Sequence, residues 1–148
     1  MPGFVKKITV ILLALVLVGT LGLSCGGERT FQQAVFDGTI TISAGGYYDI
    51  PFPWGNNFRL VVSFTVSGSS ENNIVVLILV DRAYTDWVSG HEVTALYSSG
   101  QVTKGTFNVP IKLPSGGYTY HVVYSNRFST LTKRVATTVN IEYHPVPE

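Results

Sequence analysis

The sequence predicts an all-β protein, a β-sandwich of about eight strands built as a single domain. Apolar and polar residues alternate with a period of two in several segments, which is the pattern of a strand with one buried face. Helical spacing of apolar residues is nearly absent from the body of the chain. The strand-like segments are short, and turns rich in Gly, Pro and Asn separate them, as is typical of sandwiches. A length of 148 residues leaves room for one such domain.

Seven segments carry the strand pattern most clearly. They cover residues 34–43, 47–52, 58–67, 74–80, 106–113, 118–125 and 135–143. The segment 74–80, IVVLILV, has no polar face, so we expect an internal strand that is buried on both sides. Pro110 cannot donate a ladder hydrogen bond, so its strand is expected at a sheet edge, or bulged at that residue. Residues 81–100 are expected to form the longest irregular part of the chain.

The last 45 residues hold a recognisable order of pieces: a strand, a Gly-rich turn, an aromatic strand, a polar corner and a final strand. Asn126, a residue type that tolerates left-handed backbone, marks the corner. The pieces are Gly117-Tyr118-Thr119-Tyr120, Tyr124-Ser125-Asn126-Arg127-Phe128-Ser129 and Lys133-Arg134-Val135.

This order resembles the GOLD (Golgi dynamics) domain. The resemblance implies a compact antiparallel sandwich of jelly-roll type, a fold found in cargo receptors of the early secretory pathway and in some lipid-transfer proteins. It implies no catalytic residues. The chain lacks the paired cysteines and the C-terminal membrane helix of the cargo receptors, so cargo sorting is not implied.

The N-terminus has the features of an export signal. Lys6 and Lys7 precede the apolar run 8–23, and small residues follow it, as in a secretory signal peptide. The end of the run, Leu21-Gly22-Leu23-Ser24-Cys25, resembles the lipobox of bacterial lipoproteins, which implies that Cys25 is lipidated. Two other interpretations stay open: an uncleaved anchor helix, and ordinary cleavage with secretion.

These interpretations give a division of the chain and a location. We expect a lipoprotein-type signal peptide over 1–24, a flexible tether over 25–33, the sandwich over 34–144 and a tail over 145–148. The mature protein is then extracytoplasmic and membrane-anchored in the cell envelope, through a lipid or an N-terminal helix. Without Lys6 and Lys7, eight basic side chains stand against nine acidic ones, and the absence of a basic stripe argues against nucleic acid as a partner.

The histidines do not point to catalysis. His91, His121 and His144 belong to no hydrolase or metalloprotease motif, and we expect each to have a surface or packing role. His121 is expected on the solvent side of its strand. The sequence therefore predicts no catalytic residue.

Neither a metal site nor a cofactor is expected. Asp81, Asp86 and Glu92 lie in one segment and carry oxygen ligands of the kind calcium prefers. Their spacing matches no calcium motif, so we expect solvated charges.

Aromatic residues outside the clear strands are the candidate ligand-binding residues: Trp54, Tyr84, Trp87 and Tyr97. Such rings stack on sugars or on a partner's apolar side chains. The alternative is that they close the ends of the sandwich. Strand addition at the edge over 102–112 is a further candidate, against the alternative of an edge protected by Lys and Pro.

The sequence thus favours a binding or interaction module without catalytic activity, whose partner is a protein or an envelope component. The alternative is a carbohydrate- or lipid-binding module of the envelope that uses the aromatic residues. A hydrolase would need two carboxylates or a His–carboxylate pair in a cleft, which the sequence does not predict.

Overall fold

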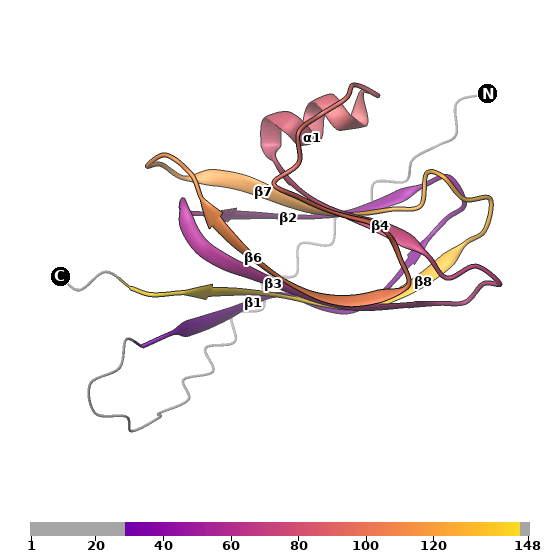
Figure 1. Ribbon diagram of the computed structural model, residues 1–148, viewed down its shortest axis with the longest axis horizontal. Coiled ribbons are helices and arrows are strands. Elements are labelled where there is room, and N and C mark those ends of the chain that lie inside the picture. The colour runs from indigo at the N-terminus through magenta and orange to yellow at the C-terminus, as the bar shows by residue number, and fades with distance from the viewer. Residues whose placement is uncertain (1–28, 146–148) are drawn as a thin grey trace.

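A computed structural model describes residues 29–145 of the chain (Figure 1). These residues form eight strands in two antiparallel sheets and one helix, which confirms the prediction of an all-β sandwich. The signal segment and Cys25 lie outside the described residues. The elements are β1 (Phe31–Ile42), β2 (Tyr47–Trp54), β3 (Asn57–Ser67), β4 (Ile74–Val80), α1 (Asp81–Val88), β5 (Tyr97–Val102), β6 (Lys104–Lys112), β7 (Tyr118–Ser125) and β8 (Lys133–Tyr143).

The chain passes from one sheet to the other at nearly every connection. The first sheet has the strand order β1-β8-β3-β6, and the second sheet has the order β2-β7-β4-β5. Among the strands of residues 29–145, only β4 and β5 follow one another within the same sheet. β5 passes into β6 through the single residue Thr103, so the chain itself joins the two sheets along that side.

The core lies between the sheets and follows the period-two alternation of the strands. Residues that face inward are almost completely removed from water, which is the main favourable term in folding. They include Leu60, Val62, Ile74, Val76, Ile78, Val122, Tyr124, Val135, Val139 and Ile141. The hydroxyl of Tyr124 is satisfied inside the core, 2.7 Å from Thr137 Oγ1, and Thr137 in turn donates to the carbonyl of Ser63 at 2.9 Å.

Two predictions about strand position are confirmed. β4, the segment without a polar face, lies inside its sheet between β7 and β5. β6, which contains Pro110, is an outer strand. Two of the other outer strands, β2 and β1, also carry features that discourage pairing with a foreign strand: Pro51 and Pro53 in β2, and a bulge between Ala34 and Phe36 in β1.

The segment 81–100 differs from the prediction, because it contains α1 and most of β5. The apolar residues of α1 have helical spacing, but only over eight residues, too few to stand out from an irregular segment. β5, YSSGQV, has no alternation at all and is a strand because β4 pairs with it. β1 also begins earlier than expected, at Phe31, inside the segment assigned to the tether.

The corner after β7 is held by side chains rather than by left-handed backbone. No non-glycine residue in the described ranges has a positive φ. Asn126 does mark the corner, but the left-handed backbone expected as the reason for it is not there. Asn126 is completely buried and donates from Nδ2 to the carbonyls of Ser43 at 3.1 Å and Leu131 at 2.7 Å. Its amide therefore ties the β1–β2 turn to the β7–β8 connection.

Candidate functional site

The two sheets present different outer faces. The outer face of the second sheet carries α1, which runs over β4 and β7 (Figure 1). Leu79 and Val123 point outward from these strands and yet are completely buried, which creates a small second core beneath the helix. The outer face of the first sheet carries no helix of the described chain, and most of its outward side chains are exposed.

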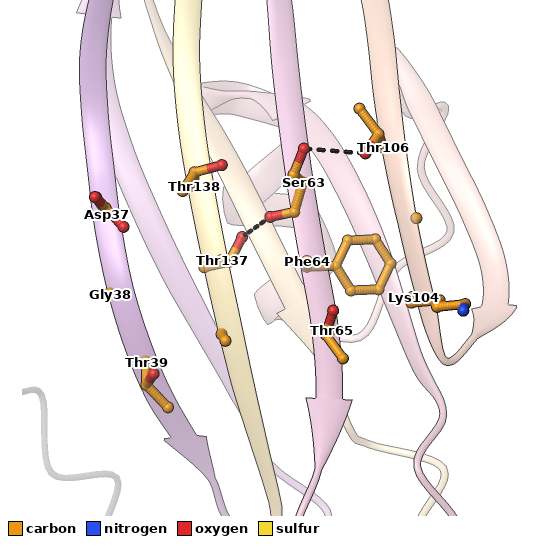
Figure 2. A pocket seen from close by; sticks show the side chains of 12 residues that line it. Asp37, Gly38, Thr39, Ser63, Phe64, Thr65, Lys104, Thr106, Thr137 and Thr138 are labelled. Atoms are coloured by element: carbon orange, nitrogen blue, oxygen red, sulfur yellow. Dashed lines mark hydrogen bonds between the residues drawn. The ribbon is translucent and has the colours of Figure 1, made fainter.

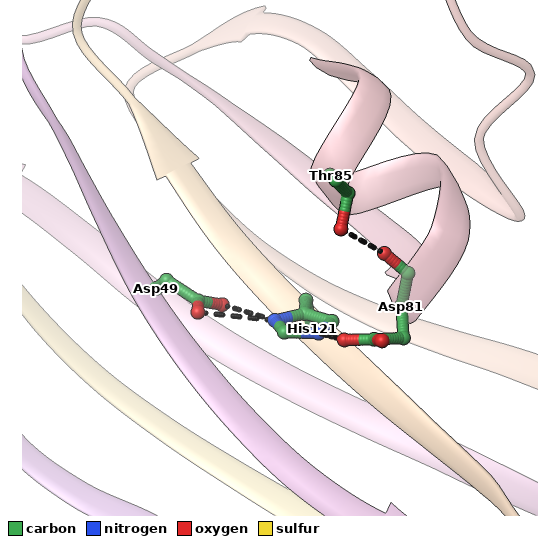
Figure 3. Close-up of polar contacts among 4 residues, drawn as sticks. All are labelled: Asp49, Asp81, Thr85 and His121. Atoms are coloured by element: carbon green, nitrogen blue, oxygen red, sulfur yellow. Dashed lines mark hydrogen bonds and ion pairs between the residues drawn. The ribbon is translucent and has the colours of Figure 1, made fainter. Parts of the chain in front are cut away.

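His121 joins the helix to the sheet. It points outward from β7 but is only 5% exposed, so its expected position on the solvent side was wrong. Nδ1 lies 3.0 Å from Asp49 on β2, and Nε2 lies 2.9 Å from Asp81 in the first turn of α1 (Figure 3). Alternation along β7 gave the correct side of the sheet, but α1 covers that side.

Two carboxylates, one at each ring nitrogen, favour the protonated form of His121. Both ring nitrogens face acceptors, so both act as donors only in the imidazolium form. Burial opposes this charge, but the hydrogen bonds and negative charges of Asp49 and Asp81 outweigh it and raise the pKa of His121. The folded surroundings therefore favour the imidazolium form of His121.

Two of the predicted binding residues, Tyr84 and Trp87, lie on α1 and pack against the protein itself. The Tyr84 ring is stacked on His121 with centroids 4.0 Å apart and planes at 6°. Burial and the neighbouring Tyr47 and Asp49 raise the pKa of Tyr84. The Arg127 guanidinium lies 3.7 Å from the Trp87 ring centroid and donates to the Trp87 carbonyl at 3.1 Å.

The other two predicted residues lie elsewhere. Trp54 is half-buried at the end of β2, where its ring meets Tyr143 at 5.3 Å and Phe58 at 6.3 Å between centroids. Tyr97 packs on Phe107 at 4.7 Å across the side of the sandwich where β5 passes into β6. The four aromatic residues therefore do not come together in one groove.

The His–carboxylate arrangement is also poorly suited to general base catalysis. Both nitrogens of His121 are engaged by carboxylates and one face of the ring is covered by Tyr84, so no lone pair faces a substrate. Asp49 and Asp81 lie at opposite nitrogens and do not converge on a point. Among residues 29–145, no group of three His, Cys, Asp or Glu side chains is arranged to hold a metal ion.

A hollow of about 500 Å³ lies on the outer face of the first sheet (Figure 2). The register aligns two rows of short side chains across its four strands. One row contains Asp37, Thr138, Ser63 and Thr106, and the next contains Thr39, Ala136, Thr65 and Lys104. The hollow is open because none of the central side chains is long.

The hollow is lined by hydroxyl groups and has one charge on each outer strand. Ser63 Oγ and Thr106 Oγ1 are 3.0 Å apart, and the exposed Thr65 and half-buried Thr138 lie beside them. Each hydroxyl both donates and accepts, so the surface suits a polar partner. No ring stands in either row.

Sequence reasoning missed this surface. Each contributing strand shows only one to three outward Ser or Thr residues, which is ordinary for a solvent face. What brings them into two rows is the pairing of β8 with both β1 and β3 and the pairing of β3 with β6, and the sequence of a single strand does not contain it.

Comparison with known proteins adds no relative: no family model and no curated protein matches the chain. The resemblance to the GOLD domain thus stays a prediction. In the part of the chain that the structure describes, no helix has the length and apolar character needed to cross a membrane.

Proposed function

We propose that the protein is an extracytoplasmic binding module, held at a membrane by its N-terminus and without catalytic activity. We further infer a sandwich of jelly-roll type related to the GOLD domain, which the strand orders β1-β8-β3-β6 and β2-β7-β4-β5 support. The binding surface is the pair of hydroxyl rows on the outer face of the first sheet, here called the hydroxyl face.

One observation carries this choice of surface: the sandwich covers one of its outer faces and leaves the other hollow. α1 and its contacts with His121 and Arg127 occupy the second sheet. The hydroxyl face has its polar groups directed outward around a hollow of about 500 Å³. A partner placed there meets hydrogen-bonding groups without displacing any described element.

A protein is the partner class that the chemistry favours. Sugar-binding surfaces commonly use aromatic rings as stacking platforms, and the hydroxyl face has none in its two rows. Short hydroxyl side chains instead leave room for an approaching backbone or polar side chain, and Asp37 and Lys104 offer one charge of each sign at the two outer strands.

Site-specific photocrosslinking in the producing cell tests the surface. A benzophenone amino acid is placed at Thr65, on the hydroxyl face, or at Ser98 on β5, which is also exposed and lies on the outer face of the second sheet. We expect a discrete protein adduct from position 65 and none from position 98. Equal adducts at both positions, or an adduct from 98 alone, would contradict the assignment, and an adduct of glycan would support the carbohydrate alternative.

The anchor has its own test. Mass spectrometry of protein extracted from membranes is expected to find a diacylglycerol adduct on Cys25 and no residues before it. Two or more acyl chains give stable attachment, which a single chain does not. Detection of an intact Met1–Ser24 segment would indicate an uncleaved helix anchor instead of a lipid. Recovery of the protein outside the membrane fraction would contradict the proposal of a membrane tether.

A further inference from the structure

One end of the sandwich gathers aromatic side chains from four strands. β1 begins there at Phe31, which pairs with Tyr143 at the end of β8. β2 ends there at Trp54, which pairs with Tyr118 at the start of β7. In Figure 1 this is the left end, where the described chain begins and where β8 ends. These four residues are called the aromatic end.

Three rings of the aromatic end are in contact, and all four residues are only partly covered. Phe31 is stacked on Tyr143 with centroids 5.8 Å apart, and Trp54 meets the same Tyr143 ring at 5.3 Å. Phe31 is 42% exposed, and the other three residues are half-buried. Exposed Phe next to half-buried Trp and Tyr is the composition of a surface that lies between an apolar and an aqueous phase.

The length of the chain before β1 limits where this end can lie. Six residue steps separate Cys25, the proposed point of attachment, from Phe31. Fully extended, they span no more than about 22 Å. β1 then runs for 12 residues away from this end, a distance of about 40 Å. The aromatic end is therefore held close to the membrane, while the opposite end of the sandwich is much farther from the attachment point.

We propose that the aromatic end rests on the lipid surface of the membrane that holds the N-terminus, with Phe31, Trp54 and Tyr143 at the boundary between headgroups and acyl chains. This inference rests on the membrane tether of the proposed function. Arg29 is an exposed cation two residues before Phe31, and its charge favours anionic headgroups. The sandwich is then oriented by two contacts, an anchor and a surface.

The two tryptophans of the chain provide the test, because they report on different ends. Trp54 belongs to the aromatic end, whereas Trp87 packs on Tyr47, at the other end of β2, with ring centroids 5.0 Å apart. The seven residue steps of β2 between Tyr47 and Trp54 correspond to about 23 Å. A quencher confined to the headgroups therefore distinguishes the two rings.

The full-length protein, extracted from membranes, is reconstituted into phosphatidylcholine–phosphatidylglycerol vesicles that contain a headgroup nitroxide lipid. Trp87→Phe leaves only Trp54 as an emitter, and Trp54→Phe leaves only Trp87. We expect the nitroxide to remove most of the Trp54 emission and little of the Trp87 emission. If Trp54→Phe does not fold, the Trp87 signal is obtained as the difference between the wild type and Trp87→Phe.

A further variant separates docking from simple tethering. Phe31→Ser, made in the Trp87→Phe protein, removes the most exposed ring of the surface while the anchor is retained. We expect it to restore a large part of the Trp54 emission. Equal quenching of both tryptophans, or quenching of Trp54 that Phe31→Ser leaves unchanged, overturns the inference and leaves the proposed function intact. Failure of the vesicles to retain the protein overturns the tether and this inference with it.

Discussion

The outer faces of the two sheets come from strands with a similar sequence pattern but differ in their exposure to solvent. In β7, the outward residues His121 and Val123 are buried, on the face over which α1 packs. In β3, the outward residues Ser63 and Thr65 are half-buried and exposed. Alternation along a strand defines which side a residue is on, and the rest of the fold decides whether that side meets water. Contacts on the covered outer face of the second sheet stabilise the fold, and the open outer face of the first sheet is available for binding.

The largest expected difference between the faces concerns apolar residues. Leu79→Ala, beneath α1, should lower the free energy of unfolding by about 3 kcal/mol because it leaves a cavity in a fully covered site. Val61→Ala, at a half-buried outward position of β3, should cost about 1 kcal/mol or less. Urea denaturation measures both values, and equal losses would show that α1 does not protect its face.

The next difference lies within the charge cluster of the covered face. The Asp49 side chain is 17% exposed and the Asp81 side chain 68%. Asp49→Asn should therefore destabilise the fold by about 1.5 kcal/mol, as expected for a buried charged hydrogen bond. Asp81→Asn should cost only about 0.5 kcal/mol, because water screens that pair. The reverse order in urea denaturation would mean that the helix contact dominates.

A smaller effect is expected at the end of α1. Arg127→Gln removes the cation from the Trp87 ring and should lower the free energy of unfolding by about 1 kcal/mol. The control is Arg134→Gln, at an exposed outward position of β8 on the open face, where we expect a change of about 0.5 kcal/mol or less. Thermal unfolding followed by circular dichroism measures both changes in stability. Equal changes in the two variants would show that the Arg127–Trp87 contact does not stabilise the fold.

The smallest effect is gradual and depends on pH. The pKa of His121 is higher in the folded chain than its value of about 6.5 in the unfolded chain. The stability it adds is complete below that unfolded value and is lost as pH rises through the raised, folded value. The midpoint of urea denaturation of the wild type should fall as the pH is raised from 6. The His121→Gln variant should lack the part of this fall that comes from deprotonation of His121. A fall of the same size in His121→Gln would assign it to other groups.

Much of the fold could be predicted because each strand carries its own alternation. The internal position of IVVLILV and the edge position of the strand with Pro110 follow from the chemistry of those residues alone. α1 could not be predicted, because eight residues give too short a pattern and the helix owes its place to contacts with His121 and Arg127, which are 40 residues away from their partners in α1.

The candidate surfaces were harder to predict than the strands. Trp54, Tyr84, Trp87 and Tyr97 were recognisable as aromatic residues outside clear strands, but the partners of their rings come from other elements. The hydroxyl rows depend on register, which sets neighbours across strands that lie up to about 100 positions apart in the chain, as Asp37 and Thr138 do. Asn126 was found as a corner residue, although its role is to donate hydrogen bonds.

The pairing of β1 with β8 has a consequence for how the molecule is made. β8 lies between β1 and β3, so the first sheet is incomplete until the last strand has left the ribosome and, in an exported chain, the translocation pore. β1 is synthesised before the other described strands, but its partner β8 is synthesised after all of them. Pairing between strands so far apart in the chain is a long-range contact of the kind that slows folding. A circular permutant that joins Tyr143 to Phe31 by a short loop and opens the chain at residues 68–73 would make these strands a hairpin, and we expect it to refold faster than the natural order.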